Sequence, residues 1–168
     1  MGLLSKIFGG SGKPRTELFT APPPPSQTAL AEAEKTLKLT FPSSFTQFMN
    51  TTREVQLPLC ARFYWVGTVA GAGPDDIVRA NRVEHEEASS RLPDFLVAFY
   101  NDGMGNQVCF DTRTRTETGE YPVVFWDHEL DSHENPQASA RPAEAFERTG
   151  IVAPSFAEWL RKLHERIA

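Results

Sequence analysis

Residues 95–129 constrain the fold more than any other stretch, because they contain three short runs of apolar, β-branched or aromatic residues. The runs occupy residues 95–100, 107–110 and 122–126, and polar or glycine-containing segments separate them. Runs of this composition with turn residues at both ends are typical of strands rather than helices. The sequence therefore predicts three successive strands at the centre of a sheet.

The segment between the first two runs contains Asp102-Gly103, a pair that favours the positive φ angles of a tight reversal. The first two strands are therefore predicted to pair as a hairpin, and Gly119 marks a second turn before the third strand. Few polar residues interrupt the runs, which indicates that helices cover part of the sheet on both faces. We predict an α+β fold with a single mixed, largely antiparallel β-sheet flanked by helices.

Helical patterns lie on both sides of this central stretch. One helix is predicted from residue 26 or 28 to residue 38, with Glu34 on its otherwise apolar face. A second helix begins after Pro42, where Ser43 and Ser44 can cap exposed amides. Further predicted elements are a strand over 59–67 and helices over 74–89, 142–148 and 154–167. The last helix has the clearest apolar stripe, formed by Phe156, Trp159, Leu160, Leu163 and Ile167.

Composition indicates one folded domain with a tail. Residues 1–27 are predicted to be flexible, because they contain a glycine-rich break and four consecutive prolines, and the domain is predicted to span residues 28–168. The two cysteines, Cys60 and Cys109, lie in apolar runs, so we expect two buried thiols in a reducing compartment. We find no signal peptide and no apolar run near the roughly 20 residues of a transmembrane helix, so we expect a cytoplasmic protein.

Charge is distributed unevenly along the chain. The formal net charge is −5, but residues 1–16 carry three basic residues and no acid, so the remaining residues carry −8. An acidic body repels phosphate backbones, which argues against nucleic-acid binding and favours a basic protein partner.

One segment contains many potential metal ligands without the spacing of a known metal site. The ligands are Asp127, His128, Glu129, Asp131, His133 and Glu134. They lack the helical His-Glu-x-x-His spacing of zinc enzymes, and no helix or strand pattern fixes their geometry. We therefore expect neither a resident metal nor a cofactor.

Two further patterns could indicate catalysis or nucleotide binding. Cys109 could act as a nucleophile with His128 as base, but a thiol between two apolar strand residues is more typical of an inert core position. Gly103-x-Gly105 is followed by a strand rather than a helix, which favours a hairpin turn over a phosphate-binding loop. We predict that the chain is not an enzyme, and a metal- or thiol-dependent enzyme is the least supported hypothesis.

Four segments, in order, resemble the SUKH superfamily, which is named for yeast cell-wall-synthesis regulators and bacterial immunity proteins. They are the apolar-Pro junction between two short helices at 37–49, the glycine turn within 96–111, the Trp-Asp-His-Glu strand end within 123–129 and the Ser-Phe-x-x-Trp-Leu helix at 155–160. The likeness spans residues 28–163. It departs at residues 50–53, where Asn-Thr-Thr-Arg replaces the Asn-Gly-Gly-like turn usual in the family.

The resemblance implies an α+β domain without catalytic residues. It further implies an immunity protein that neutralises a cognate bacterial toxin, possibly a nuclease, by direct binding. The alternative is a regulatory or scaffold module linked to cell-envelope synthesis. The candidate partner-binding residues are acids near strand ends and loops, with a histidine beside them: Glu34, Asp94, Asp102, Asp127, His128, Glu129 and Asp131.

Overall fold

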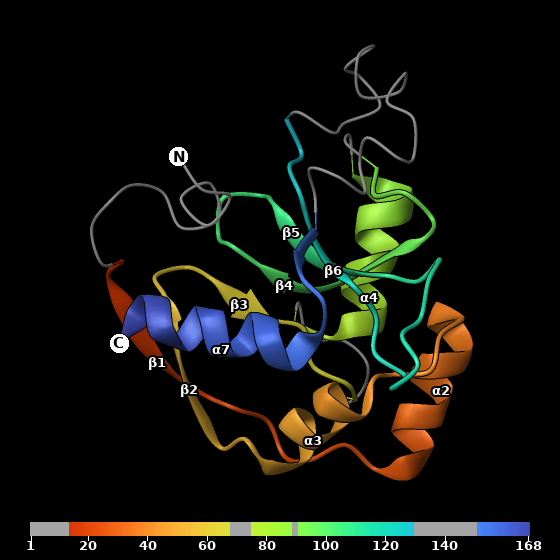
Figure 1. The fold of residues 1–168 in the computed structure, drawn as a ribbon, viewed down its shortest axis with the longest axis horizontal. Coiled ribbons are helices and arrows are strands. Elements are labelled where there is room, and N and C mark those ends of the chain that lie inside the picture. The colour runs from red at the N-terminus through yellow and green to blue at the C-terminus, as the bar shows by residue number, and fades with distance from the viewer. Residues whose placement is uncertain (1–13, 68–74, 89–90, 130–150) are drawn as a thin grey trace.

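The computed structural model describes residues 14–67, 75–88, 91–129 and 151–168, and all structural statements below refer to these residues. Helices and strands are interspersed along the chain (Figure 1). In order, the elements are β1 Thr16–Thr20, α2 Gln27–Leu37, α3 Ser43–Thr51, β2 Glu54–Pro58, β3 Arg62–Phe63, α4 Ile77–Arg82, the π-helix η2 Val83–Glu87, β4 Leu96–Asn101, β5 Gln107–Asp111, β6 Val123–Trp126, β7 Ile151–Ala153 and α7 Phe156–Ile167.

The strands form two antiparallel sheets. One has five strands in the order β3-β4-β5-β6-β7, and the other consists of β1 and β2. The α+β class and the predominantly antiparallel pairing are confirmed, although the strands divide between two sheets where one was expected. Within the described ranges, parallel pairing is limited to an isolated bridge between Trp65 and Asp76. Figure 1 shows α7, in blue, lying across the five-stranded sheet.

The predicted central hairpin is confirmed. β4 pairs with β5, which aligns Ala98 with Cys109, and β5 pairs with β6, which aligns Cys109 with Val124. Gly103 and Gly105 in the connecting turn have φ angles of 83° and 95°, which residues with a Cβ rarely adopt. The two glycines therefore allow the chain to reverse at this point.

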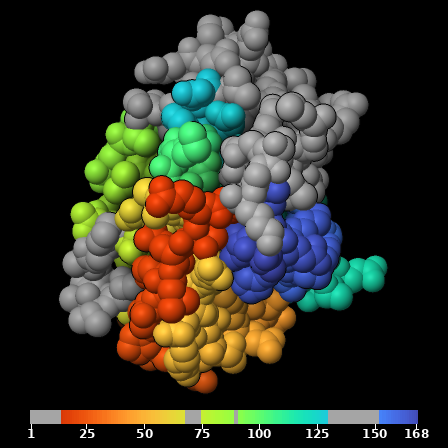
Figure 2. Space-filling model, turned by 90° about the vertical axis from the view of Figure 1, so that its left-hand side faces the viewer, coloured from red at the N-terminus to blue at the C-terminus, as the bar shows by residue number. Residues whose placement is uncertain are grey.

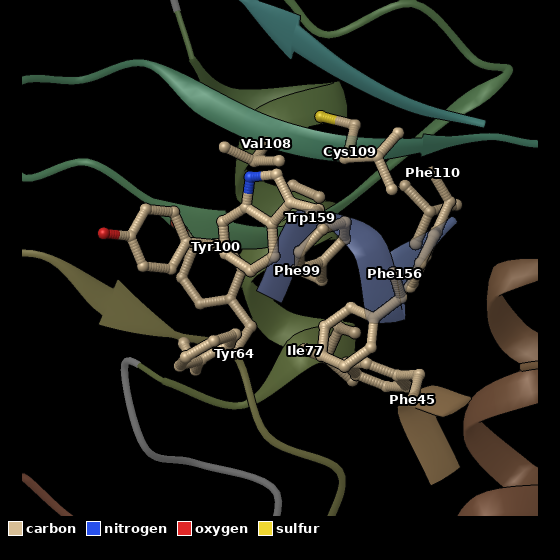
Figure 3. Packing of buried hydrophobic residues seen from close by; sticks show 14 of the residues in the cluster. Phe45, Tyr64, Ile77, Phe99, Tyr100, Val108, Cys109, Phe110, Phe156 and Trp159 are labelled. Atoms are coloured by element: carbon tan, nitrogen blue, oxygen red, sulfur yellow. The ribbon is translucent and has the colours of Figure 1, made fainter. Parts of the chain in front are cut away.

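The five-stranded sheet is covered on both faces, as its apolar runs predicted. On one face, Phe110 packs near Phe156 of α7, and Phe156 contacts Trp159 of the same helix (Figure 3). Successive strand residues point to opposite faces, so Cys109 points away from α7. On that second face, burial and, secondarily, the nearby Glu84 carboxylate of η2 raise the pKa of the Cys109 thiol. Helix α7 and the α4–η2 segment thus enclose the sheet.

Asn81 joins α4 to β4. Its buried side chain donates hydrogen bonds to the carbonyl oxygens of Ile77 (2.9 Å) and Ala98 (2.8 Å) and accepts one from the Ala98 amide (2.8 Å). Strand β3 pairs with β4 only at Tyr100 and Asn101, so Ala98 lies beyond its reach. The Asn81 amide satisfies the backbone groups that the short edge strand leaves unpaired.

Helix α3 is capped by a residue that is distant in the sequence. The serines after Pro42 were expected to cap this helix, but its N-cap residue makes no side-chain cap bond. Instead, the carboxylate of Glu120 accepts hydrogen bonds from the Ser44 amide (3.3 Å) and the Ser44 hydroxyl (2.7 Å). A carboxylate at this position also interacts favourably with the positive end of the helix dipole. Glu120 thereby fixes α3 against the loop between β5 and β6.

Residues 16–20 differ from the predicted flexible tail over 1–27. They form β1, which pairs with β2 from Thr16 opposite Pro58 to Thr20 opposite Glu54. Phe19 explains the difference, because its ring stacks on Trp65 with centroids 6.0 Å apart and thereby attaches the strand to the core. The folded part of the chain therefore begins before residue 28, and residues 1–13 lie outside the described ranges.

Only Arg62 and Phe63 of the strand predicted over 59–67 pair with β4. The chain turns just before them, because the Ala61 amide donates to the Pro58 carbonyl (3.0 Å) and Cys60 adopts a φ of 69°. Cys60 is consequently exposed, which corrects the expectation of two buried thiols, whereas Cys109 is buried.

The helix predicted over 74–89 divides into two parts. Helix α4 begins after Asp76, whose side chain accepts a hydrogen bond from the Arg79 amide (3.0 Å), and it continues into the π-helix η2. The acidic run in η2 was expected to be solvated, but Glu84 is half-buried while Glu86 and Glu87 are exposed. The terminal helix is confirmed as α7. The helix predicted over 142–148 lies outside the described ranges.

Candidate functional site

The carboxylate of Asp102 holds the turn between β4 and β5. Its Oδ1 accepts hydrogen bonds from the backbone amides of Met104 (2.8 Å) and Asn106 (3.1 Å), and its Oδ2 accepts one from the Asn106 side chain (2.8 Å). Asn101 adds a further bond, since its Oδ1 accepts from the Gly103 amide (2.7 Å). Side chains that bond to the backbone two residues later fix a turn locally. This turn is therefore shaped by its own side chains before any partner binds.

Asn106 connects this turn to the end of β6. Because its Nδ2 donates to Asp102, its Oδ1 is the acceptor that faces His128. That oxygen accepts from the His128 backbone amide (3.3 Å) and lies 2.9 Å from the ring Nδ1. The neutral imidazole must therefore carry its hydrogen on Nδ1, which leaves the Nε2 lone pair available. In the same segment, Asp127 accepts a hydrogen bond from the Glu129 amide (3.0 Å).

The exposed turn at Leu59 and Cys60 lies against these residues. A Cβ at Gly103 would come within 2.8 Å of the Cys60 carbonyl group, and a Cβ at Gly105 within 3.0 Å of the His128 ring. Both positions therefore require glycine for close approach as well as for backbone conformation. We call the group formed by residues 59–60, 102–106 and 127–129 the strand-end surface.

The strand-end surface combines exposed apolar side chains with acids. Met104 is 74% exposed and Leu59 is 49% exposed. The charged residues that define the surface are acidic, apart from His128, and Glu17 adds another carboxylate where it accepts a hydrogen bond from the Cys60 amide (3.1 Å). Apolar anchors within a polar rim are the usual anatomy of a protein–protein interface.

Glu84 of η2 is half-buried and interacts electrostatically with His128. Burial raises the pKa of the Glu84 carboxyl, and attraction to His128 partly opposes that shift. Tyr64 is buried nearby and donates a hydrogen bond to Gln107 Oε1 (3.1 Å). Burial and then the Glu84 charge raise the pKa of the Tyr64 hydroxyl above its ordinary value. A half-buried carboxylate therefore interacts electrostatically both with His128 of the strand-end surface and with a buried tyrosine.

Some of the sequence-predicted site residues come together here. Asp102, Asp127, His128 and Glu129 all belong to the strand-end surface, because the carboxyl ends of β4 and β6 meet at one end of the antiparallel sheet. Asp94 is exposed but precedes β4, which places it about 20 Å from Asp102, the length of a six-residue strand.

Two other candidate residues are not part of this surface. Glu34 lies on α2, where its Oε1 accepts a hydrogen bond from the Phe41 amide (2.8 Å). It also lines a surface hollow of ≈ 520 Å³ together with Lys35 and Lys38, which are unsuited to a basic partner. Asp131 lies outside the described ranges, as do the potential metal ligands His133 and Glu134. Within those ranges, no group of three or more His, Cys, Asp or Glu side chains converges as a metal site would require.

Sequence reasoning missed the residues that organise the strand-end surface. Asn106 carries the link between Asp102 and His128, and Met104 and Leu59 supply the exposed apolar area. The pattern Asp102-Gly103-x-Gly105-Asn106 was visible as a turn signal. It indicated the reversal of the chain, but the contact with His128 depends on the pairing of β5 with β6.

None of the helices in the described part of the chain has the length and apolar composition needed to cross a membrane. The fold is thus an α+β domain in which helices enclose an antiparallel sheet and a preformed acidic turn lies at one sheet end. Residues 24–162 match the sequence model of the SMI1 / KNR4 family (SUKH-1). The chain belongs to this family, which confirms the resemblance to the SUKH superfamily. No curated protein matches the chain.

Proposed function

We propose that this chain is a non-catalytic immunity protein that acts in the cytoplasm and blocks a basic bacterial toxin by binding it through the strand-end surface. The observation that carries the proposal is Met104, which is 74% exposed on a turn that Asp102 and Asn106 already fix. A preformed turn loses little conformational entropy on binding, so burial of its apolar anchor contributes fully to affinity. Membership of the family supports protein binding as the general role.

The charge of the surface supports a basic partner. Asp102, Asp127 and Glu129 belong to the same surface as the apolar anchors, and the chain beyond residue 16 is strongly acidic. Complementary charge mainly accelerates association and selects the partner, whereas buried anchors slow dissociation. A nuclease toxin is a suitable partner, because a basic nucleic-acid-binding face would meet these carboxylates.

The absence of catalysis in this proposal is supported by Cys109. Its thiol is fully buried, and burial raises its pKa, so the reactive thiolate is disfavoured. A nucleophilic role would require an accessible thiolate beside a base. Nδ1 of His128, however, is engaged with Oδ1 of Asn106.

Isolation of the partner tests the proposal directly. The tagged full-length chain, purified from its native source, should retain a toxin-like polypeptide, and co-expression of the chain should protect cells from that polypeptide. Recovery of no such polypeptide, or toxicity that the chain does not relieve, would contradict the proposed function.

A matched pair of charge reversals tests the location of the interface. Glu129 and Asp94 are both exposed acids, but only Glu129 belongs to the strand-end surface. We expect Glu129→Lys to reduce the association rate with the partner by tenfold or more at low salt, on the order seen for rim charges. Asp94→Lys introduces the same change in net charge and should leave the rate within about twofold. Equal effects of the two substitutions would place the interface elsewhere.

The family match itself favours a second candidate function, a regulatory or scaffold module linked to cell-envelope synthesis. Such a module could use the apolar residues near the N-terminus in addition to the folded surface. Deletion of residues 1–13 discriminates between the two functions, since it leaves β1 intact. Full neutralisation of a toxin by the shortened chain supports the immunity protein, and loss of an envelope phenotype supports the scaffold.

A further inference from the structure

Strand β1 has one edge that is paired and one that is not. At the two ends of its pairing with β2, the Ala21 amide donates to the Arg53 carbonyl and the Leu59 amide donates to the Arg15 carbonyl, each at 2.8 Å. Hydrogen-bonding direction alternates along a strand, so every second residue from Arg15 to Ala21 faces β2. The backbone groups of the residues in between therefore point away from β2. These residues are Thr16, Leu18 and Thr20.

The outward edge of β1 lacks the features that normally prevent edge-to-edge pairing. Its backbone groups make no hydrogen bond with any described residue, and its register with β2 runs without a bulge over the whole strand. The strand Thr16–Thr20 contains neither lysine nor proline, which are the usual protective residues at an edge. Its central side chain, Leu18, is 67% exposed. In Figure 2 the red residues of β1 lie at the surface beside the yellow residues of β2.

The residues of this edge are arranged symmetrically about Leu18. The strand reads Thr-Glu-Leu-Phe-Thr, so two copies aligned antiparallel at Leu18 place Thr16 of one copy opposite Thr20 of the other. Each outward residue then meets a hydrogen-bonding residue of the second copy. Paired threonines and paired leucines are favourable cross-strand neighbours, and Glu17 is aligned with Phe19 rather than with another acid.

We propose that β1 is a homodimer interface, in which β1 strands from two copies of this chain pair antiparallel about a twofold axis at Leu18. The pairing joins the two-stranded sheets of both copies into one four-stranded sheet. A self-complementary patch of this kind is what a twofold interface requires. Two paired strands alone bury less area than the standard protein interface of roughly 1,200–2,000 Å², so we expect the dimer to dissociate on dilution. The inference is independent of the proposed toxin binding.

Sedimentation equilibrium of the full-length chain tests the association. The mass should rise with concentration from the 18.7 kDa of one chain towards twice that value. Leu18→Lys should keep the mass at that of one chain, because a charge at the twofold axis meets its own copy. The matched control Met104→Lys alters a similarly exposed apolar residue away from β1, and this variant should self-associate like the unmodified chain. A single-chain mass for the unmodified protein at several hundred micromolar would overturn the proposal.

Disulfide trapping tests the register without relying on affinity. In a Cys60→Ser background, Leu18→Cys places two thiols on hydrogen-bonded partner residues whose Cα atoms lie about 5.5 Å apart, a separation that a disulfide can span. Mild oxidation should therefore yield a covalent dimer. Thr20→Cys alone should not, because its partner in the second copy is Thr16. A mixture of Thr20→Cys and Thr16→Cys chains should crosslink again, and equal crosslinking of Leu18→Cys and Thr20→Cys alone would reject this register.

Discussion

At the scale of single residues, Asn106 is the link on which the strand-end surface depends. Its amide group accepts from His128 and donates to Asp102, so its removal takes one hydrogen-bond partner from each of these side chains. We expect Asn106→Ala to lower the free energy of unfolding by about 1–2 kcal/mol, the usual effect of losing a partly exposed hydrogen-bond partner. We also expect weaker partner binding, because the turn that presents Met104 becomes less ordered.

Urea denaturation and partner titration measure the two effects of Asn106→Ala. Asn50→Ala is a suitable control, since this residue of α3 is exposed and its side chain makes no hydrogen bond with any described residue, whereas its backbone carbonyl accepts from Arg53. Its free energy of unfolding should stay within about 0.5 kcal/mol of the unmodified chain. Unchanged binding by Asn106→Ala would show that the link between Asp102 and His128 does not shape the interface.

The partly buried carboxyl of Glu84 leads to a prediction about how stability depends on pH. Burial raises the folded-state pKa of its carboxyl above 4.5, so the folded state resists its ionisation. The contribution of Glu84 to stability therefore decreases as pH rises from below 4.5 through that raised pKa. Glutamine does not ionise, so Glu84→Gln should be more stable than the unmodified chain at pH 7 and equally stable below pH 4. Urea midpoints at both pH values test this, with exposed Glu86→Gln as the control.

At the scale of elements, the orientation of α3 depends on Glu120. The Glu120 carboxylate accepts hydrogen bonds from both the amide and the hydroxyl of Ser44, although the two residues are far apart in the sequence. We expect Glu120→Ala to lower the free energy of unfolding by about 1–3 kcal/mol, since partly buried donors at the helix start lose their acceptor. Glu120→Gln should lose less, because it keeps an acceptor and removes only the charge. Thermal unfolding that ranks the two variants in the opposite order would contradict this role.

The strands that were predictable from the sequence are those whose partners lie nearby in the chain. The runs that became β4, β5 and β6 are apolar apart from Gln107, because helices cover both sheet faces, and the turn at Gly103 connects two of them. Strand β2 was not predicted, because its short alternating pattern forms a strand by pairing with β1, which was itself expected to be part of a flexible tail. The strand expected over 59–67 was shortened by Cys60, whose positive φ nothing in its residue type indicates.

The candidate site was predictable to a similar degree. The candidate acids were chosen because they lie near strand ends and loops, and Asp102 and Glu129 come to the same sheet end because β4 and β6 run in the same direction on either side of β5. Glu34 could not be assigned from its helical position, because its carboxylate bonds to the Phe41 amide beyond the end of the helix. Exposed Met104 and Leu59 were also missed, since apolar residues within turns resemble core residues in a sequence.

At the scale of the whole molecule, β1 belongs to the folded unit. Phe19 stacks on Trp65, and β1 pairs with β2 along its entire length. We therefore expect deletion of residues 1–21 to lower the free energy of unfolding by several kcal/mol, on the order of a lost buried aromatic plus its strand pairing. Deletion of residues 1–13 should have little effect on stability. Chemical denaturation measures the free energy of unfolding of both shortened chains. Equal values would show that β1 does not stabilise the folded domain.

The hydrogen bond from His128 to Asn106 gives this protein a built-in spectroscopic probe. Because one ring nitrogen is committed to an internal acceptor, the nitrogen resonances of this imidazole should report a single tautomer in the unliganded chain. An arriving macromolecule that donates to the other nitrogen would move that resonance without any attached dye. The same signal could then follow complex formation in a titration of an isotope-labelled sample.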